Sequence, residues 1–304
     1  MRSIARWVGM LGALVATAGV VAVAPSPAFA ASGRVAVVDQ RHGIQMFNLA
    51  NSSWNGRAPL WSFNRSGRAW SNLSDVRFRS YGGRNTVLVT ASGGMAATVD
   101  YATRRVTWSQ NVGGNPHSME LLPSGAVVIA SSAGRLTAYG KGRHTPHSVS
   151  FANAHAVLWN AATHRLWALG GTRLCSFAVT GTATSPRLTG RSCVAVPSGA
   201  HDLSPVYGSS TRLWFSTHSH VYRYDISRGT RSRAPGYIDE ASIKSVGNQP
   251  GGLVITSQAT HGNSDGTWGT GNVWLYRQNG SYAGNRYRAG AAIYKARPVV
   301  WERR

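Results

Sequence analysis

Residues 115–133 read NPHSMELLPSGAVVIASSA. This stretch predicts a short strand over 116–122, a tight turn at Pro123-Ser124-Gly125, and a second strand over 126–130. Pro, Ser and Gly in succession mark a turn, and a short apolar run rich in β-branched residues suits a buried strand. His117 lies at the start of the first strand, so it opens the hairpin.

Similar hairpins recur along the chain, each opened by a polar or charged residue. The other openers are Asp75, His155, His201 and Lys244. Almost nothing after residue 30 favours helix, and strand-like runs alternate with Gly, Ser, Asn and Asp. A four-stranded unit about every forty residues is typical of a β-propeller blade.

The N-terminal unit lacks its first strand. Residues 34–39, 43–49 and 59–63 supply its other three strands, and the run 295–301 (KARPVVW) has the composition of the missing one. A run near 290–294 then serves as the fourth strand of the preceding unit. We therefore expect an all-β fold, a six-bladed β-propeller whose C-terminal strand completes the first blade and removes the open edges.

Residues 1–30 have the features of a signal peptide: a positive start, an apolar run over 7–24, and the small-x-small sequence Ala28-Phe29-Ala30. The alternative is an uncleaved membrane anchor, which is disfavoured by Pro25-Ser26-Pro27, a break in the apolar run, and by the cleavage pattern. No later segment approaches membrane-spanning length. We expect a secreted, extracellular protein without a stable membrane span, with a single propeller domain over 31–304.

The chain is strongly basic, with 32 Lys and Arg against 10 Asp and Glu and a net charge of +22. Such a charge attracts acidic polysaccharides, anionic cell-wall polymers or, non-specifically, nucleic acid. The alternative is a basic surface without a ligand. The sequence has no run of Lys or Arg and no long helix that would indicate a specific nucleic-acid partner. We expect the protein to be a monomer.

The two cysteines, Cys175 and Cys193, lie in strand-like runs that should be antiparallel neighbours. Export to an oxidising compartment favours a disulfide between them. Neither has a nearby His or Cys in the sequence, which argues against a metal or catalytic role.

The first strand of a propeller blade is innermost, so the openers should line one mouth of the central channel. The predicted set is Arg297, Asp75, His117, His155, His201 and Lys244. Neighbouring positions and turns on the same face add candidate ligand-binding residues: Asp39, Gln40, Asn115, Asp202, Gln258, Trp70 and Trp268. The two tryptophans are candidates for a sugar-stacking platform. Propellers usually bind ligands at this place.

Three hypotheses remain open for this cluster. His117, His155 and His201 could bind a divalent metal such as zinc or manganese and leave the fourth position open. Without a metal, the histidines with Lys244 and Arg297 could act as acid, base and anion clamp on an acidic substrate. In the third hypothesis they are structural residues that bind channel water.

Several reaction classes lack their signatures. The sequence has no Gly-x-Ser-x-Gly, no phosphate loop and no Gly-rich dinucleotide turn. Acidic residues are too few and too dispersed for the paired carboxylates of an ordinary glycosidase, with only Asp39, Asp75 and Asp202 near the axis.

Four motifs in order carry a resemblance: Asn115-Pro116-His117-Ser118, Ala154-His155-Ala156-Val157-Leu158-Trp159, His201-Asp202-Leu203-Ser204-Pro205 and Lys244-Ser245-Val246-Gly247-Asn248. Together they resemble a family of secreted bacterial six-bladed propellers of unknown function, over nearly the whole mature chain. The resemblance implies the fold and no activity.

Two weaker likenesses suggest activities. The hairpin 117–125 is similar to a unit of the arylsulfate sulfotransferases, propellers with axial histidines of which one is a nucleophile. Propeller polysaccharide lyases that act on uronate chains also gather histidines at the channel mouth, which is a likeness of architecture.

The sequence therefore predicts an axial His/Lys/Arg site for an anionic ligand, an acidic glycan processed by lyase or glycoside hydrolase chemistry. The alternatives are non-catalytic binding of anionic cell-wall or extracellular polymers, and His-dependent sulfuryl transfer.

Overall fold

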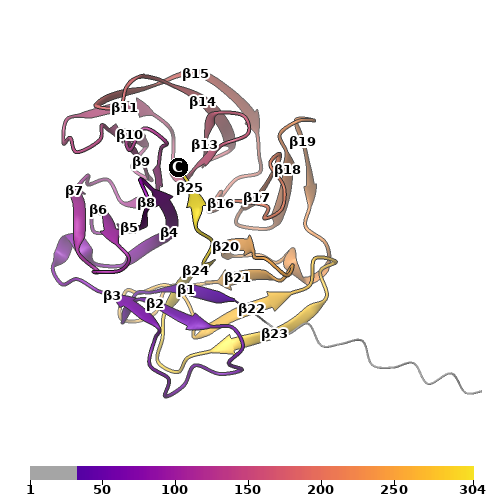
Figure 1. Ribbon diagram of the computed structural model, residues 1–304. Helices are drawn as coiled ribbons and strands as arrows, with labels where there is room; N and C mark the ends of the chain where they lie inside the picture. The colour runs from indigo at the N-terminus through magenta and orange to yellow at the C-terminus, as the bar shows by residue number, and fades with distance from the viewer. Residues whose placement is uncertain (1–32) are drawn as a thin grey trace, which may run out of the picture. The chain divides into compact units, whose positions relative to one another are not determined.

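The computed structural model describes residues 33–304, which form six antiparallel sheets around a central channel (Figure 1). Each sheet is a blade with its first strand innermost, so the six-bladed propeller expected from the repeats is confirmed. The signal-peptide prediction concerns residues outside the described range. Within that range, no helix has the length and apolar character needed to cross a membrane.

The first three blades are given from the channel outward. The first comprises β24 (Ile293–Pro298), β1 (Arg34–Asp39), β2 (Gly43–Asn48) and β3 (Trp61–Phe63). The second comprises β4 (Leu73–Tyr81), β5 (Arg84–Ala91), β6 (Met95–Asp100) and β7 (Val106–Asn111). The third comprises β8 (Pro116–Leu121), β9 (Val127–Ser131), β10 (Arg135–Tyr139) and β11 (Pro146–Ser150).

The remaining blades follow the same order. The fourth comprises β12 (Ala154–Asn160), β13 (Arg165–Gly170), β14 (Arg173–Thr182) and β15 (Ser185–Ala195). The fifth comprises β16 (Asp202–Pro205), β17 (Arg212–Ser216), β18 (Val221–Asp225) and β19 (Thr230–Arg233). The sixth comprises β20 (Ile243–Asn248), β21 (Val254–Gln258), β22 (Asn272–Tyr276) and β23 (Tyr282–Tyr287). Two single-turn 3₁₀ helices, η1 (Arg68–Trp70) and η2 (Gly236–Ile238), connect blades.

The ring closes where β24 pairs antiparallel with β1, as the sequence predicts. The closing strand is Ile293–Pro298 and not 295–301, so it begins and ends earlier than predicted. The fourth strand of the sixth blade is accordingly β23 and not the run near 290–294. The last residues form β25 (Glu302–Arg303), which pairs parallel with β4 at the centre of the ring (Figure 1).

The hairpin β8–β9 shows why the repeat folds locally. Gly125 adopts a left-handed φ of 84°, and its N–H donates to the carbonyl of Leu122 at 2.9 Å. A Cβ at this glycine would lie 2.4 Å from the hydroxyl oxygen of Tyr81. Glycine is therefore required both by the turn conformation and by the close packing of the neighbouring blade.

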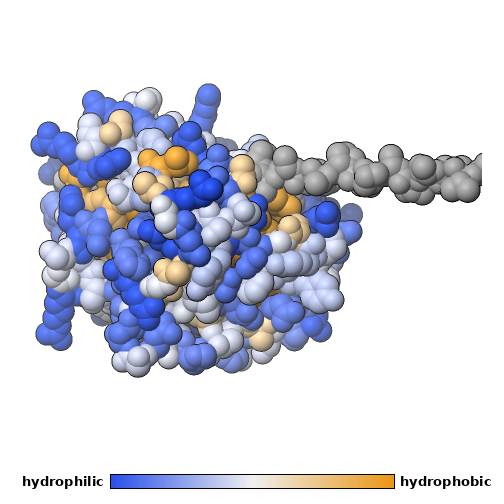
Figure 2. Space-filling view, turned by 90° about the horizontal axis from the view of Figure 1, so that it is seen from below, coloured by the Kyte–Doolittle hydropathy of each residue, from blue (hydrophilic) through white to orange (hydrophobic). Residues whose placement is uncertain are grey.

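The core consists of apolar side chains packed between adjacent blades. Trp61 of the first blade stacks on Tyr101 of the second, with ring centroids 5.8 Å apart. The predicted disulfide is confirmed: Cys175 and Cys193 are bonded and lie opposite each other in β14 and β15. The surface seen from below is mainly hydrophilic, with scattered apolar residues (Figure 2).

Candidate functional site at the channel mouth

Each inner strand carries one extra residue where it enters the channel. In five strands this residue has no partner in the antiparallel register, which defines a β-bulge that can re-aim a side chain. In β16 the equivalent residue precedes the strand, and its N–H donates to Ser216, the residue paired with Asp202. The six residues in blade order are Tyr294, Ser74, His117, His155, His201 and Lys244.

A residue with positive φ stands two positions before the extra residue in five blades. These residues are Asn72, Asn115, Asn153, Gly199 and Ser242. Asn and Gly tolerate the left-handed conformation better than other residues do. The sequence Asn/Gly-x-His therefore recurs because the backbone requires a residue that tolerates positive φ two positions before the histidine. This residue marks where the inner strand begins.

The bulges correct two of the predicted positions. Asp75 and Arg297 were expected at the level of His117, but Ser74 and Tyr294 occupy that level in their blades. Asp75 and Arg297 lie deeper along their strands. The Asn-x-Ser sequence at 72–74, parallel to Asn-x-His at 115–117, is the signal that would have given the correct register.

Three histidines from consecutive blades do converge at the mouth. The rings of His117 and His155 stack with centroids 4.4 Å apart and planes 13° apart. His155 meets His201 edge-on at 5.5 Å, and His117 lies 6.2 Å from Tyr294, a residue that the sequence did not suggest. The predicted convergence of the openers is therefore correct for the histidines.

Lys244 completes this cluster from the sixth blade. Its Nζ lies 3.0 Å from Nε2 of His201 and 5.7 Å from the ring centroid of Trp268. Trp268 is 42% exposed, and its backbone N–H donates to Oε1 of Gln40 at 2.7 Å. Gln40 in turn donates to the carbonyl of Leu73, so it ties the Trp268 loop to the second blade.

These side chains surround an open pocket of about 340 Å³. Its lining residues are Gln40, Asn72, Ser92, Asn115, His117, His201, Lys244, Trp268 and Tyr294. The volume lies within the range of about 300–1,000 Å³ typical of small-ligand pockets. No described Asp or Glu lines it, which leaves a basic and aromatic pocket.

Burial sets the protonation states at the mouth. It lowers the pKa of His155 to about 4. Burial and the neighbouring Lys244 charge lower the pKa of His201 to about 3, and the pKa of His117 also lies well below 6.5, chiefly because of burial. Burial and Lys295 lower the pKa of Lys244 to about 8. At neutral pH the imidazoles are therefore uncharged and Lys244 is the cation of the pocket.

The geometry does not support the metal hypothesis. No group of three or more His, Cys, Asp or Glu in residues 33–304 is arranged to hold a metal ion. The lone pairs of an imidazole lie in its ring plane, so the stacked rings of His117 and His155 cannot converge on one ion. Nε2 of His201 also has a hydrogen-bond partner already, because Nζ of Lys244 lies 3.0 Å from it.

A buried ion network lies deeper in the channel. Arg297 donates to Asp75 at 2.8 Å and to Asp202 at 2.7 Å, and Lys295 Nζ lies 3.3 Å from Asp202. Arg77 also pairs with Asp75, at 3.1 Å. Burial alone would raise the pKa of Asp75, but Arg297 and Lys295 hold it below its usual value. The mouth pocket is therefore not lined by Asp75, Asp202 or Arg297, because these side chains form ion pairs with one another deeper in the channel.

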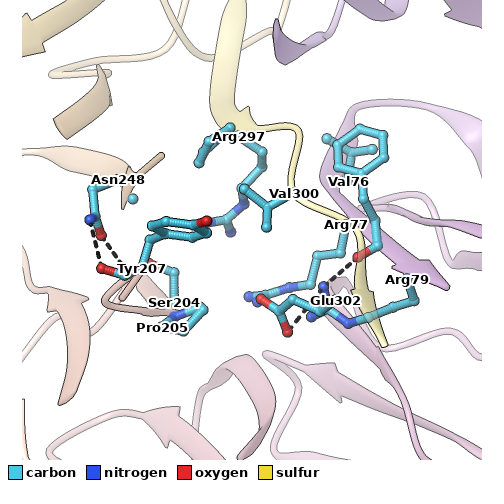
Figure 3. A pocket seen from close by; sticks show the side chains of 13 residues that line it. Val76, Arg77, Arg79, Ser204, Pro205, Tyr207, Asn248, Arg297, Val300 and Glu302 are labelled. Atoms are coloured by element: carbon cyan, nitrogen blue, oxygen red, sulfur yellow. Dashed lines mark hydrogen bonds and ion pairs between the residues drawn. The ribbon is translucent and has the colours of Figure 1, made fainter. Parts of the chain in front are cut away.

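The C-terminal segment crosses the opposite end of the channel. Val300, Glu302 and Arg297 gather there with Arg77 and Arg79 around a cavity of only about 60 Å³ (Figure 3). The sequence did not suggest this arrangement. The last six residues, 299–304, show no periodic pattern that would predict pairing with another strand.

Three other predicted ligand-binding residues lie outside the pocket. Asp39 is buried and accepts backbone hydrogen bonds from Arg41 and Ala292. Gln258 donates to the carbonyl of Ala241. Trp70 packs edge-on against Phe63 in the core between the first two blades, so it cannot form a sugar-stacking platform.

Comparisons with known proteins give a family and a fold. Residues 66–301 match a family of unknown function, DUF6528. A crystal structure of a protein of unknown function from Bacteroides caccae is similar with a TM-score of 0.60 and 10% identity, covering 88% of this chain and 99% of that one. At such identity the likeness shows the fold alone.

Two further solved structures have lower TM-scores. Dihydro-heme d1 dehydrogenase NirN gives 0.49 at 15% identity, covering 89% of this chain, which spans only 58% of that one. Hydrazine synthase of Kuenenia stuttgartiensis gives 0.45 at 11% identity, covering 71% and 66%. No curated protein sequence matches the chain, and the likeness to arylsulfate sulfotransferases gains no support.

Proposed function

Because the chain belongs to the DUF6528 family of unknown function, we propose a function from its own geometry: the mouth pocket of this secreted propeller binds the carboxylate of an acidic glycan. Lys244 carries the proposal. It is buried to 6% exposure, and its hydrogen-bond partner is the neutral ring of His201. A buried ammonium group without a carboxylate partner favours a ligand that supplies the missing negative charge.

The neighbouring side chains suit a sugar. Trp268 presents an exposed ring beside Lys244, and a flat aromatic surface packs against the apolar face of a pyranose. Nδ1 of His117 and of His201 are buried without a hydrogen-bond partner among the described residues. Water or ligand hydroxyls would satisfy such atoms.

The overall charge supports a polymeric ligand. A net charge of +22 raises the local concentration of polyanions and speeds their encounter with the pocket. Specificity then comes from the pocket, because a general basic surface does not distinguish one polyanion from another.

The lowered pKa of Lys244, about 8, favours β-elimination as a second candidate function. The neutral amine takes the proton on the carbon next to the uronate carboxylate. The electron pair of that C–H bond forms a carbon–carbon double bond as the glycosidic C–O bond breaks. The leaving oxygen then takes a proton from the Lys244 ammonium, which restores the base.

The two candidates require opposite charge states of one residue. Binding as an anion clamp requires charged Lys244 and weakens above about pH 8, whereas elimination requires the neutral amine and accelerates through the same pH. Hydrolysis by paired carboxylates has no support, because no Asp or Glu is among the lining residues of the mouth pocket.

Calorimetry with a uronate oligosaccharide tests the proposal, with a neutral oligosaccharide of equal length as the ligand control. Lys244→Met should weaken uronate binding roughly tenfold to hundredfold, the usual effect of losing a charge-assisted hydrogen bond. Lys141→Met removes an exposed lysine that lies over Tyr81 and should leave affinity unchanged. Equal affinities in wild type and Lys244→Met would overturn the proposal. A rise in ultraviolet absorbance from the unsaturated product would identify elimination.

A further inference from the structure

The fifth blade carries a second basic cavity, away from the channel mouth. It has a volume of about 330 Å³, and its lining residues come from β17, β18 and β19 and the turn between the last two. These three strands lie outside β16 in the fifth blade (Figure 1). Its lining includes Arg231 and three further arginines, which we call the fifth-blade arginine cluster: Arg212, Arg223 and Arg228. None of the lining residues is shared with the mouth pocket.

The sheet register brings these arginines together. Arg223 pairs across the sheet with Trp214, and Arg212 pairs with Asp225. Since side chains two positions apart share a face, Arg212 and Arg223 are diagonal neighbours on one face of the blade. Arg228 comes from the turn between β18 and β19. Arg231 is opposite Tyr224, so its side chain lies on the other face of the blade, where it donates to the carbonyl of Ala195 at 2.9 Å.

The charge of the cluster is poorly compensated. Asp225 is the single carboxylate of the cavity, and its Oδ1 accepts hydrogen bonds from Ser227 and from the backbone N–H of Arg228 within the turn. Its Oδ2 lies 3.7 Å from Nε of Arg212. The cluster therefore has three guanidinium groups beside one carboxylate, which is two positive charges in excess.

Among the arginines of the cluster, Arg223 has the strongest need for an anionic partner. Its guanidinium lies over Trp214 with 5.3 Å between Cζ and the ring centroid, and it is half-buried. Burial and the charge of Arg212 lower its pKa. None of the carboxylates in residues 33–304 forms an ion pair with it. Stacking on an aromatic ring holds a guanidinium in place with its N–H groups still free to donate.

We propose that the fifth-blade arginine cluster is a second anion site, which binds a tetrahedral dianion, either a phosphate monoester or an inorganic phosphate or sulfate ion. Planar guanidinium groups donate paired hydrogen bonds to such oxygens. A dianion compensates both excess charges, whereas a uronate compensates only one. This site does not depend on the function of the channel mouth.

Calorimetry with inorganic phosphate, inorganic sulfate and glycerol phosphate tests the site and separates its possible sources, with a monosulfated disaccharide as the monoanionic comparison. Arg223→Gln should weaken binding roughly tenfold or more. Arg228→Gln, in an exposed turn, should do the same and avoids any loss of packing on Trp214. Arg135→Gln removes the same charge from the exposed start of β10 and should have no effect.

The outcomes are distinct. Losses in Arg223→Gln and Arg228→Gln alone support the site, and the ligand with the highest affinity identifies the source. Equal small losses in all three variants, or no measurable dianion binding to the wild type, would overturn it and leave only a diffuse basic surface. Lys244→Met should not change phosphate or sulfate binding, so failure at either site can be recognised separately.

Discussion

Replacing Asp202 by Asn should weaken the buried ion network that joins three blades across the channel, and so lower the stability of the fold. Asp202 is fully buried and accepts hydrogen bonds from Arg297 at 2.7 Å, from Lys295 at 3.3 Å and from the backbone N–H of Val246 at 3.0 Å. Its hydrogen-bond partners lie in the first and sixth blades, whereas Asp202 itself lies in the fifth. It therefore links the inner strands of three successive blades of the ring, β16, β20 and β24.

The size of the effect follows from the charges. The network contains three cations, Arg77, Lys295 and Arg297, against Asp75 and Asp202. The Asn variant leaves three buried cations with one carboxylate. Removing one partner of a buried ion pair costs about 3–5 kcal/mol, out of a total stability of about 5–15 kcal/mol. We expect a loss of that size in the free energy of unfolding.

Urea unfolding followed by tryptophan fluorescence measures this loss without added salt. Asp225→Asn, at the end of β18, removes a carboxylate whose ion pair with Arg212 is long and partly exposed; it is the matched control and should cost about 1 kcal/mol or less. Adding Arg297→Met to Asp202→Asn restores the original excess charge and should recover a clear part of the loss. A cost in Asp202→Asn no greater than that of the control, with no recovery in the double variant, would refute the reasoning.

Three further predictions concern the disulfide, the aromatic wall and acid stability. Replacing both Cys175 and Cys193 by Ser opens a loop of sequence separation 18 and should cost about 3 kcal/mol in urea unfolding; an unchanged midpoint would contradict this. Trp268→Ala should weaken uronate binding roughly tenfold with unchanged stability, and calorimetry that finds full affinity would exclude the aromatic wall. Because His155 has its pKa lowered from 6.5 to about 4, its neutral form stabilises the fold above pH 6.5, and this contribution is lost as the pH falls towards 4. His155→Gln should therefore flatten the pH dependence of unfolding in that window, and an identical slope would count against a buried neutral imidazole.

The blades and their closure could be predicted because each blade is a local unit. Its turns and its alternation of polar and apolar residues are contained in about forty residues. The closing strand followed from the absence of an inner strand before Arg34 and the presence of a spare one near Lys295. The convergence of His117, His155 and His201 then followed from the fold.

The errors arose where one extra residue changes the register. A bulge is invisible to a pattern with a period of two, so Asp75, which follows Ser74 directly, was expected one position too high; Arg297 lies three residues after Tyr294, because the closing strand begins earlier than predicted. Their role became clear only from their ion pairs deep in the channel. The parallel pairing of β25 with β4 joins segments from opposite ends of the chain. No local signal in Glu302–Arg303 predicts it.

The pH dependence of uronate binding tests the central claim most directly, because Lys244 is the cation of the mouth pocket. Calorimetry across a pH series should give a constant affinity well below pH 8 and a falling affinity above about pH 8, as the ammonium loses its proton. Lys244→Met should bind weakly at every pH. An affinity that stays constant through pH 8, or that falls equally in Lys244→Met, would contradict the assignment of this pocket as the anion site.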